Sequence, residues 1–195
     1  MTIDELKKYV SIKEIKGDCV RVKANEGYML KLGDSYTDEL YCERSAIPEN
    51  LVVVSYSTYL TESNKEKYKG MTVEEAKEIL IAEITAYDTS SAVNGFVLNG
   101  ALVWLDKATR VGLMNSTTIA KAAGLETTTL WLGGVKLVVD CDKAIQLLSA
   151  LEMYALECFN VTASHKAAVG ELKSIEEVEA YDYKAGYPQM LKMSV

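Results

Sequence analysis

The stretch FVLNGALVWLDKATR, residues 96–110, places an Asn-Gly pair between two apolar runs. Asn99-Gly100 is the strongest short-range hairpin signal that a sequence offers, because a type I′ turn needs positive φ at both central residues. Asp106 follows the second run, at the position where the N-cap of a helix is expected. The stretch therefore predicts a β-hairpin that leads directly into a helix.

The cluster at the end of this stretch, formed by Trp104, Asp106 and Arg110, has a structural and a catalytic interpretation. Residues two apart on a strand face the same side, and residues four apart on a helix are close enough to pair. We therefore expect Trp104 to anchor the hairpin, Asp106 to cap the helix and Arg110 to hold the cap. A catalytic site would need a nucleophile, base or metal beside these residues. The sequence places none there, so we predict a structural joint and no catalytic residues.

A second hairpin signal, Gly133-Gly134 in TTTLWLGGVKLVVD, repeats this arrangement. Asn99 and Gly133 are 34 positions apart, as are the two acids Asp106 and Asp140 that end the hairpins. Hairpin, acidic cap and helix thus occur twice in register, which indicates a possible internal repeat. Layer packing then predicts a single sheet of about four strands with helices on one face.

The chain divides into two parts around a charged segment. Residues 1–60 contain short alternating or apolar runs between turn residues, which predict a small antiparallel β module. Residues 61–70, TESNKEKYKG, are charged and end in glycine, and we interpret them as a linker. In residues 71–195 the two hairpins are expected to pack with about three to five helices. The predicted fold class is α+β.

Periodic apolar residues predict the helices of the second part. Thr72 and Glu75 form a capping box before one helix, and Ser174 and Glu177 form another box near the end of the chain. Asp140 or Asp142 is expected to cap the strongest helix. The run VTASHKAAVGEL after Asn160 is expected to be helical too. The buried face of the strongest helix is expected to contain Ile145, Leu148, Leu151, Ala155 and Phe159.

Composition and charge exclude several classes of function. The 195 residues include 28 acidic and 21 basic side chains, a net charge of −7, which disfavours nucleic acid and anionic membranes as partners. No apolar run approaches the roughly 20 residues of a membrane-spanning helix, and the start MTIDELKKYV lacks the apolar core of a signal peptide. We therefore expect the protein in the bacterial cytoplasm, or in a particle assembled there.

Residues that could carry chemistry are few and scattered. The four cysteines have no C-x-x-C spacing and His165 is the only histidine, so we predict buried thiols and no metal site. Gly133-Gly134 lies outside any phosphate-binding signature, and no cofactor is predicted. Tyr181, Tyr183 and Tyr187 cluster near the end of the chain. They predict either a partner surface or packing of the tail onto the domain.

Several segments together resemble a known family: VLNGALVWLDKATRVGL, LWLGGVKLVV, LSALEMYALEC, HKAAVGEL and IEEVEAYDYKAGYP. They are similar to the domain of unknown function DUF4376, which occurs in bacteriophage and prophage tail-region proteins. The residues that carry the resemblance are Asn99, Gly100, Trp104, Asp106, Arg110, Trp131, His165 and Lys166. The likeness runs from about residue 71 to residue 195, and a weaker one links residues 1–60 to β modules from phages of gut Bacteroidales.

The resemblance implies a phage-tail structural or assembly protein with no assigned catalytic residues. Its expected partners are further copies of itself or other tail proteins, and assembly into the virion tail would follow expression in the cytoplasm. The chain lacks the long repetitive shaft of tail-fibre members, which favours a separate small component.

An alternative function is a small-ligand or glycan-binding module of a host-recognition apparatus. Trp104 and Trp131 would then form an exposed stacking platform. Their burial separates the two hypotheses, because two buried tryptophans would leave no platform.

Overall fold

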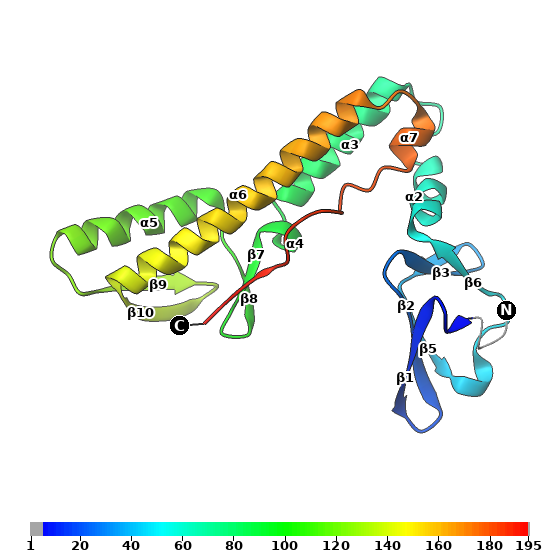
Figure 1. The fold of residues 1–195 in the computed structure, drawn as a ribbon, viewed down its shortest axis with the longest axis horizontal. Coiled ribbons are helices and arrows are strands. Elements are labelled where there is room, and N and C mark those ends of the chain that lie inside the picture. Colours follow the sequence, from blue (N-terminus) through cyan, green and yellow to red (C-terminus); the bar gives the residue numbers. More distant parts are fainter. Residues whose placement is uncertain (1–5, 195) are drawn as a thin grey trace. The chain divides into compact units, whose positions relative to one another are not determined.

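The computed structural model describes residues 6–194 and confirms the α+β class (Figure 1). The chain forms two compact units. Unit 1 comprises residues 1–76 and 173–182, and unit 2 comprises residues 77–172 and 183–195. Residues 1–5, the start of the expected β module, and residue 195 lie outside the described part. Among the described helices, none combines the length and apolar composition needed to cross a membrane.

Unit 1 contains two three-stranded antiparallel sheets, as expected for a small β module. The first has the order β1-β2-β5, with β1 Val10–Lys16, β2 Cys19–Ala24 and β5 Glu39–Glu43. The second has the order β4-β3-β6, with β4 Ser35–Thr37, β3 Tyr28–Leu32 and β6 Leu51–Ser55. A 3₁₀ turn, η1 Arg44–Ala46, follows β5. The buried side chains of the module are Leu6, Val10, Val20, Val22, Leu30 and Leu51.

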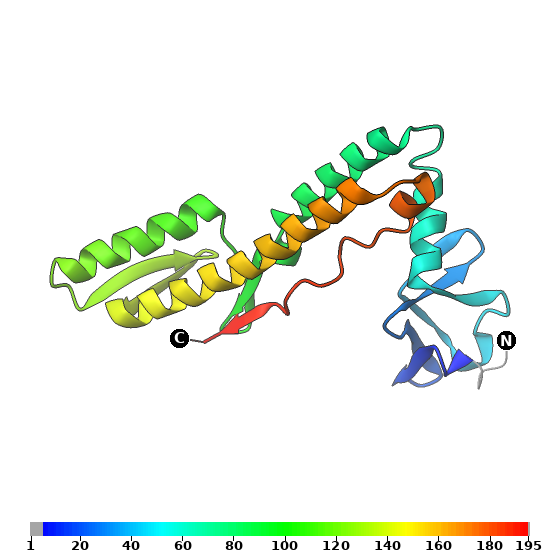
Figure 2. The same ribbon diagram turned by 45° about the horizontal axis from the view of Figure 1, so that its top comes forward.

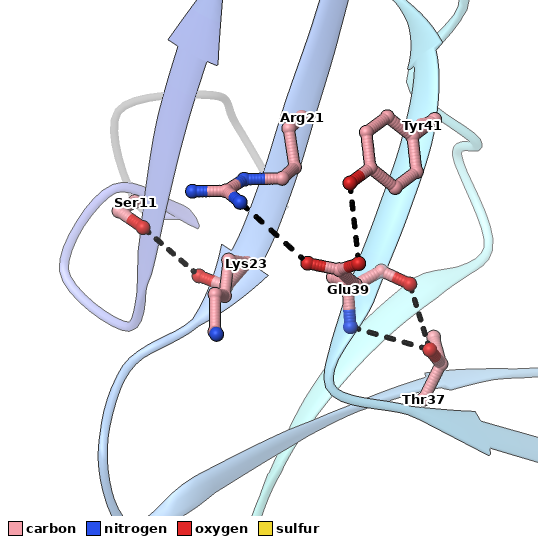
Figure 3. A network of polar contacts seen from close by, with 6 residues as sticks. All are labelled: Ser11, Arg21, Lys23, Thr37, Glu39 and Tyr41. Carbon is pink, nitrogen blue, oxygen red and sulfur yellow. Dashed lines mark hydrogen bonds and ion pairs between the residues drawn. The ribbon is translucent and has the colours of Figure 1, made fainter. Parts of the chain in front are cut away.

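Polar side chains on one face of the first sheet reinforce the pairing of β2 with β5 (Figure 3). Glu39 lies opposite Lys23, and Tyr41 lies opposite Arg21. The Glu39 carboxylate accepts a hydrogen bond from Tyr41 Oη at 3.2 Å and lies 3.8 Å from Arg21 Nη1. Thr37 Oγ1 donates to the Glu39 carbonyl oxygen at 2.7 Å. Opposite charges at diagonal positions stabilise a sheet, so this network has a structural role.

The segment expected to be a linker, residues 61–70, contains ordered structure. Helix α2, Tyr56–Lys65, extends into it, and the Tyr68 ring is 1% exposed. A short helix from the C-terminal part of the chain, α7 Ile175–Glu179, packs against α2. Asn64 Nδ2 donates to the Glu179 carbonyl oxygen at 2.8 Å. Residues 173–182 therefore belong to unit 1, although we expected them in the second domain.

Two long helices run side by side, α6 within unit 2 and α3 for most of its length (Figures 1 and 2). Helix α3, Val73–Asp88, begins at the predicted capping box, in which Thr72 N donates to Glu75 Oε2 at 2.8 Å. Helix α6, Cys141–Glu171, runs through Asn160 without a break and includes most of the following run that we expected to be helical. The segment after Asn160 has no helix-breaking residue early enough to interrupt the backbone hydrogen bonds. Lys77 Nζ donates to the Gly170 carbonyl oxygen at 3.2 Å and joins the two helices.

The two predicted hairpins form, but they do not share one sheet. The first consists of β7, Gly95–Leu98, and β8, Ala101–Trp104. The second consists of β9, Thr127–Leu132, and β10, Val135–Asp140. The expected four-stranded sheet is therefore wrong, because β7 pairs in parallel with β11, Leu191–Met193, and β9 and β10 pair only with each other.

The repeated order of hairpin, acidic cap and helix is confirmed. Asp106 caps α5, Lys107–Ala122, and Asp140 caps α6. A four-residue helix, α4 Ser91–Asn94, precedes the first hairpin. The helices and hairpins enclose one apolar core, in which the buried residues are Val93, Phe96, Leu98, Val103, Leu105, Leu130, Leu132, Val139, Ala144, Leu148, Leu151, Tyr154 and Cys158.

Candidate functional site

The joint between the first hairpin and α5 has the predicted backbone geometry. Asn99 has φ 50° and Gly100 has φ 86°, the positive values that a type I′ turn requires. Asp106 Oδ1 accepts from Thr109 N at 2.9 Å, and Asp106 Oδ2 accepts from Thr109 Oγ1 at 2.6 Å. These hydrogen bonds favour the carboxylate and lower the pKa of Asp106. The carboxyl group is therefore charged at neutral pH.

Arg110 is placed by a partner that the sequence did not indicate. Its side chain is nearly buried, at 9% exposure, and Nε donates to Glu152 Oε1 of α6 at 2.8 Å. Nη1 donates to the Leu105 carbonyl oxygen, also at 2.8 Å. In the described part of the chain, the ion pair of Arg110 is with Glu152, whereas we expected Asp106. Arg110 thus joins α5 to α6 in place of holding the cap.

A pocket of about 520 Å³ opens beside this joint, within unit 2. Trp104 at the end of β8 and Arg110 in α5 contribute to one wall of the pocket, and α6 contributes another. Its lining residues are Asp88, Thr89, Asn94, Trp104, Leu105, Asp106, Lys107, Arg110, Glu152, Ala155, Leu156 and Phe159. The volume falls within the roughly 300–1,000 Å³ typical of small-molecule sites.

The α6 wall of the pocket contradicts one expectation about packing. Phe159, expected on the buried face of the helix, is 59% exposed, whereas Leu148 and Leu151 are buried as predicted. Glu152, Leu156 and Phe159 follow each other at intervals of four and three residues, which places them on a common face of the helix. This spacing is visible in the sequence and could have predicted that the three side chains form one wall of a pocket.

Tyr154 fixes α4 and α6 next to the pocket. Its hydroxyl donates to the Val93 carbonyl oxygen at 2.6 Å, and the Cys158 thiol contacts the same oxygen at 3.5 Å. Burial raises the pKa of Tyr154 well above its usual value and also raises the pKa of Cys158. Both groups are therefore neutral donors that hold Val93 and its neighbour Asn94 in position.

The two tryptophans are both exposed, Trp104 at 43% and Trp131 at 61%. Trp104 lines the pocket, whereas Trp131 lies on the second hairpin and is not among the lining residues. A stacking surface is therefore available at each ring, but the pocket brings only Trp104 together with Asp106 and Arg110.

The tyrosines near the end of the chain contact their own chain. The rings of Tyr183 and Tyr187 each meet the Tyr87 ring edge-on, with centroids 5.6 and 5.5 Å apart. Tyr187 Oη lies 2.9 Å from Thr162 Oγ1. Tyr181 belongs to unit 1 and is half-buried. These contacts match the tail-packing interpretation for Tyr183 and Tyr187.

The other candidates for chemistry remain separate. His165 Nε2 lies 2.9 Å from the Ala185 carbonyl oxygen, and its ring lies beside Tyr187. All four cysteines are free thiols; Cys141 and Cys158 are buried, and Cys19 and Cys42 are half-buried. Within residues 6–194, no group of three or more histidine, cysteine, aspartate or glutamate side chains is arranged to hold a metal ion.

Unit 2 is thus defined by two hairpins with capped helices and a half-open pocket beside the first joint. A family model, the domain of unknown function DUF4376, matches residues 75–185, which is more than half of the chain. The chain belongs to this family, as the resemblance predicted, and the whole pocket lies within the matched region. No curated protein and no solved structure matches the chain.

Proposed function

We propose that this chain is a non-enzymatic, self-associating structural or assembly protein of bacteriophage or prophage tails. The order of the hairpin, cap and helix motifs resembles that of phage tail-region proteins, and this resemblance supports the role. The observation that carries the proposal is the outer face of the second hairpin, where Trp131 is 61% exposed and Val138 is 65% exposed. Contiguous exposed apolar surface is a feature of interaction sites, and these two side chains are neighbours on one face.

The register of the hairpin explains why the two side chains lie together. Trp131 pairs with Lys136 and Thr129 pairs with Val138, so all four side chains share the outer face. Trp131 and Val138 occupy diagonal positions of that face, within contact distance for a tryptophan. The apolar centre is therefore a small patch on a hairpin that pairs with no other described strand.

The charges on the outer face favour a second copy as the occupant. Lys136 and Asp140 lie on this face of β10, four residues apart, which corresponds to about 13 Å along a strand. In a two-fold interface the same patch is used twice, so residue i meets residue j and j meets i. An antiparallel arrangement would set Lys136 against Asp140 of the partner subunit, with Val138 between these two positions of β10 and Trp131 beside Lys136.

Substitution Lys136→Glu tests this arrangement by placing like charges across the interface. We expect the dissociation constant of the dimer, measured by sedimentation equilibrium, to rise about tenfold, as like-charge contacts weaken association. Lys13→Glu makes the same change in net charge on an exposed position of unit 1 and should leave association unchanged. Equal effects of the two substitutions would refute the interface.

A second candidate function, a small-ligand-binding module of a host-recognition apparatus, is favoured by the pocket. Trp104 is exposed and contributes one wall of a cavity that is large enough for a small molecule. A screen of soluble glycans and small amphiphiles by isothermal titration calorimetry tests this function. Binding that Trp104→Ala abolishes and Trp131→Ala preserves would support it, and the opposite pattern would oppose it.

A further inference from the structure

The polar side chains at the floor of the pocket are already engaged with each other. Asp106 uses both carboxylate oxygens to accept from Thr109. Arg110 donates to Glu152 and to the Leu105 carbonyl oxygen. A ligand rich in hydroxyl groups would compete with these hydrogen bonds, and each buried donor that it displaced would be left unsatisfied, which disfavours such a ligand.

The side chains from α3 and α4 are engaged in the same way. Asp88 Oδ1 accepts from Thr162 Oγ1 at 2.8 Å, and the Asp88 carbonyl oxygen accepts from the Asn94 amide. Thr89 Oγ1 donates to the Ala86 carbonyl oxygen at 3.1 Å. The pocket therefore offers a ligand few uncommitted hydrogen-bonding groups, whereas the formal negative charges of Asp88 and Asp106 remain in its lining.

Apolar side chains form the accessible surface of the pocket. Trp104 is 43% exposed on β8, and Leu156 and Phe159 are 50% and 59% exposed on α6. Each ring has a face of negative electrostatic potential, which attracts a cation within about 6 Å of the ring centre. The walls therefore suit an apolar or aromatic body and tolerate positive charge next to it.

The charges that line the pocket also favour a positively charged ligand. Three carboxylates, those of Asp88, Asp106 and Glu152, stand against two cations, Lys107 and Arg110, which leaves a net charge of −1. Arg110 is buried and paired with Glu152, so its charge is compensated. Asp106 and Lys107 are exposed, and the flexible lysine side chain can turn toward water.

We propose that this pocket binds a small organic cation, in which an apolar or aromatic body carries an ammonium group at its edge. The body would lie between Trp104 and Phe159, and the ammonium group would face Asp106 and Asp88. This inference goes beyond self-association and rests on the second candidate function, for which it names the class of ligand. Association is measured independently of ligand binding, so each can fail without the other.

Three probes with the same ring and different charges test the proposal: benzyltrimethylammonium, benzyl alcohol and benzoate. The chain has two tryptophans, so Trp131→Phe leaves Trp104 as the single fluorescent reporter. We expect the cation to bind about tenfold more tightly than benzoate, with the alcohol in between, because the pocket carboxylates attract the cation and repel the benzoate anion. Calorimetry on the unsubstituted chain should give the same order.

Two variants localise the binding. Phe159→Ala removes one aromatic side chain from the pocket and should weaken binding of the cation about tenfold. Ile119→Ala, at a 68% exposed position away from the pocket, should leave binding unchanged. Asp106→Asn keeps an efficient N-cap and removes one charge, so it should reduce the preference for the cation over benzyl alcohol about fivefold. Benzoate binding as tightly as the cation, or no cation binding, would overturn the proposal.

Discussion

At the scale of single residues, Arg110 shows what local spacing can and cannot reveal. The interval of four between Asp106 and Arg110 correctly places both residues at the start of a helix. It does not show that Arg110 turns toward Glu152, 42 positions away, because the partner depends on how α5 packs against α6. The cap itself was predictable, since Asp106 accepts its hydrogen bonds from Thr109, within its own helix turn.

Glu152→Ala should therefore destabilise unit 2. The change leaves the Arg110 guanidinium nearly buried with only its backbone partner, and we expect a loss of about 2–3 kcal/mol. This is below the roughly 3–5 kcal/mol for a fully buried pair, because the Glu152 side chain is 35% exposed. Urea unfolding followed by tryptophan fluorescence reports on unit 2, where both tryptophans lie. Glu157→Ala, at an exposed position on the same helix, should change stability by less than about 0.5 kcal/mol.

The cap at Asp106 should make part of the stability of unit 2 depend on pH. The pKa of Asp106 is lowered from its usual 3.8 by the hydrogen bonds from Thr109. A carboxyl group with a lowered folded-state pKa stabilises the fold above its unfolded-state pKa, and this contribution is lost as pH falls through the folded-state pKa. The stability difference between the native chain and Asp106→Ala should be constant near neutral pH and decrease below about pH 4. A difference that stays constant down to pH 2 would contradict this.

At the scale of elements, the hairpins were predictable and their pairing was not. Asn99-Gly100 and Gly133-Gly134 define the turns through local backbone geometry. The neighbour of β7 is β11, which comes from the end of the chain, and no local pattern indicates that choice. The pocket was missed for the same reason, because its walls come from β8 and α6.

The turn of the second hairpin gives a test at this scale. Gly133 and Gly134 have φ of 58° and 83°, so alanine at either position adds strain of about 1–2 kcal/mol. A methyl group at Gly133 would also lie 3.2 Å from Val103 Cγ2, whereas a methyl group at Gly134 has open space. Gly133→Ala should therefore lower the urea midpoint more than Gly134→Ala. The reverse order would show that the hairpin tip does not pack on β8 as described.

At the scale of the whole molecule, the sequence indicated two parts but misplaced their boundary. Residues 61–70 have the composition of a linker, yet they contain the end of α2 and the buried Tyr68. Residues 173–182 join unit 1 through the contact of α7 with α2. Such a return of the chain depends on tertiary contacts between distant segments, which periodicity does not encode.

The central claim is that the outer face of the second hairpin mediates association of the full chain. Light scattering behind a sizing column, on the native chain and on a Trp131→Thr/Val138→Thr variant, tests it most directly. Threonine keeps the strand preference and removes the apolar patch. We expect a dimer for the native chain, a monomer for the double variant, and a dimer for the control Ile119→Thr. A native chain that is monomeric at every concentration, or a double variant that stays dimeric, would contradict the claim.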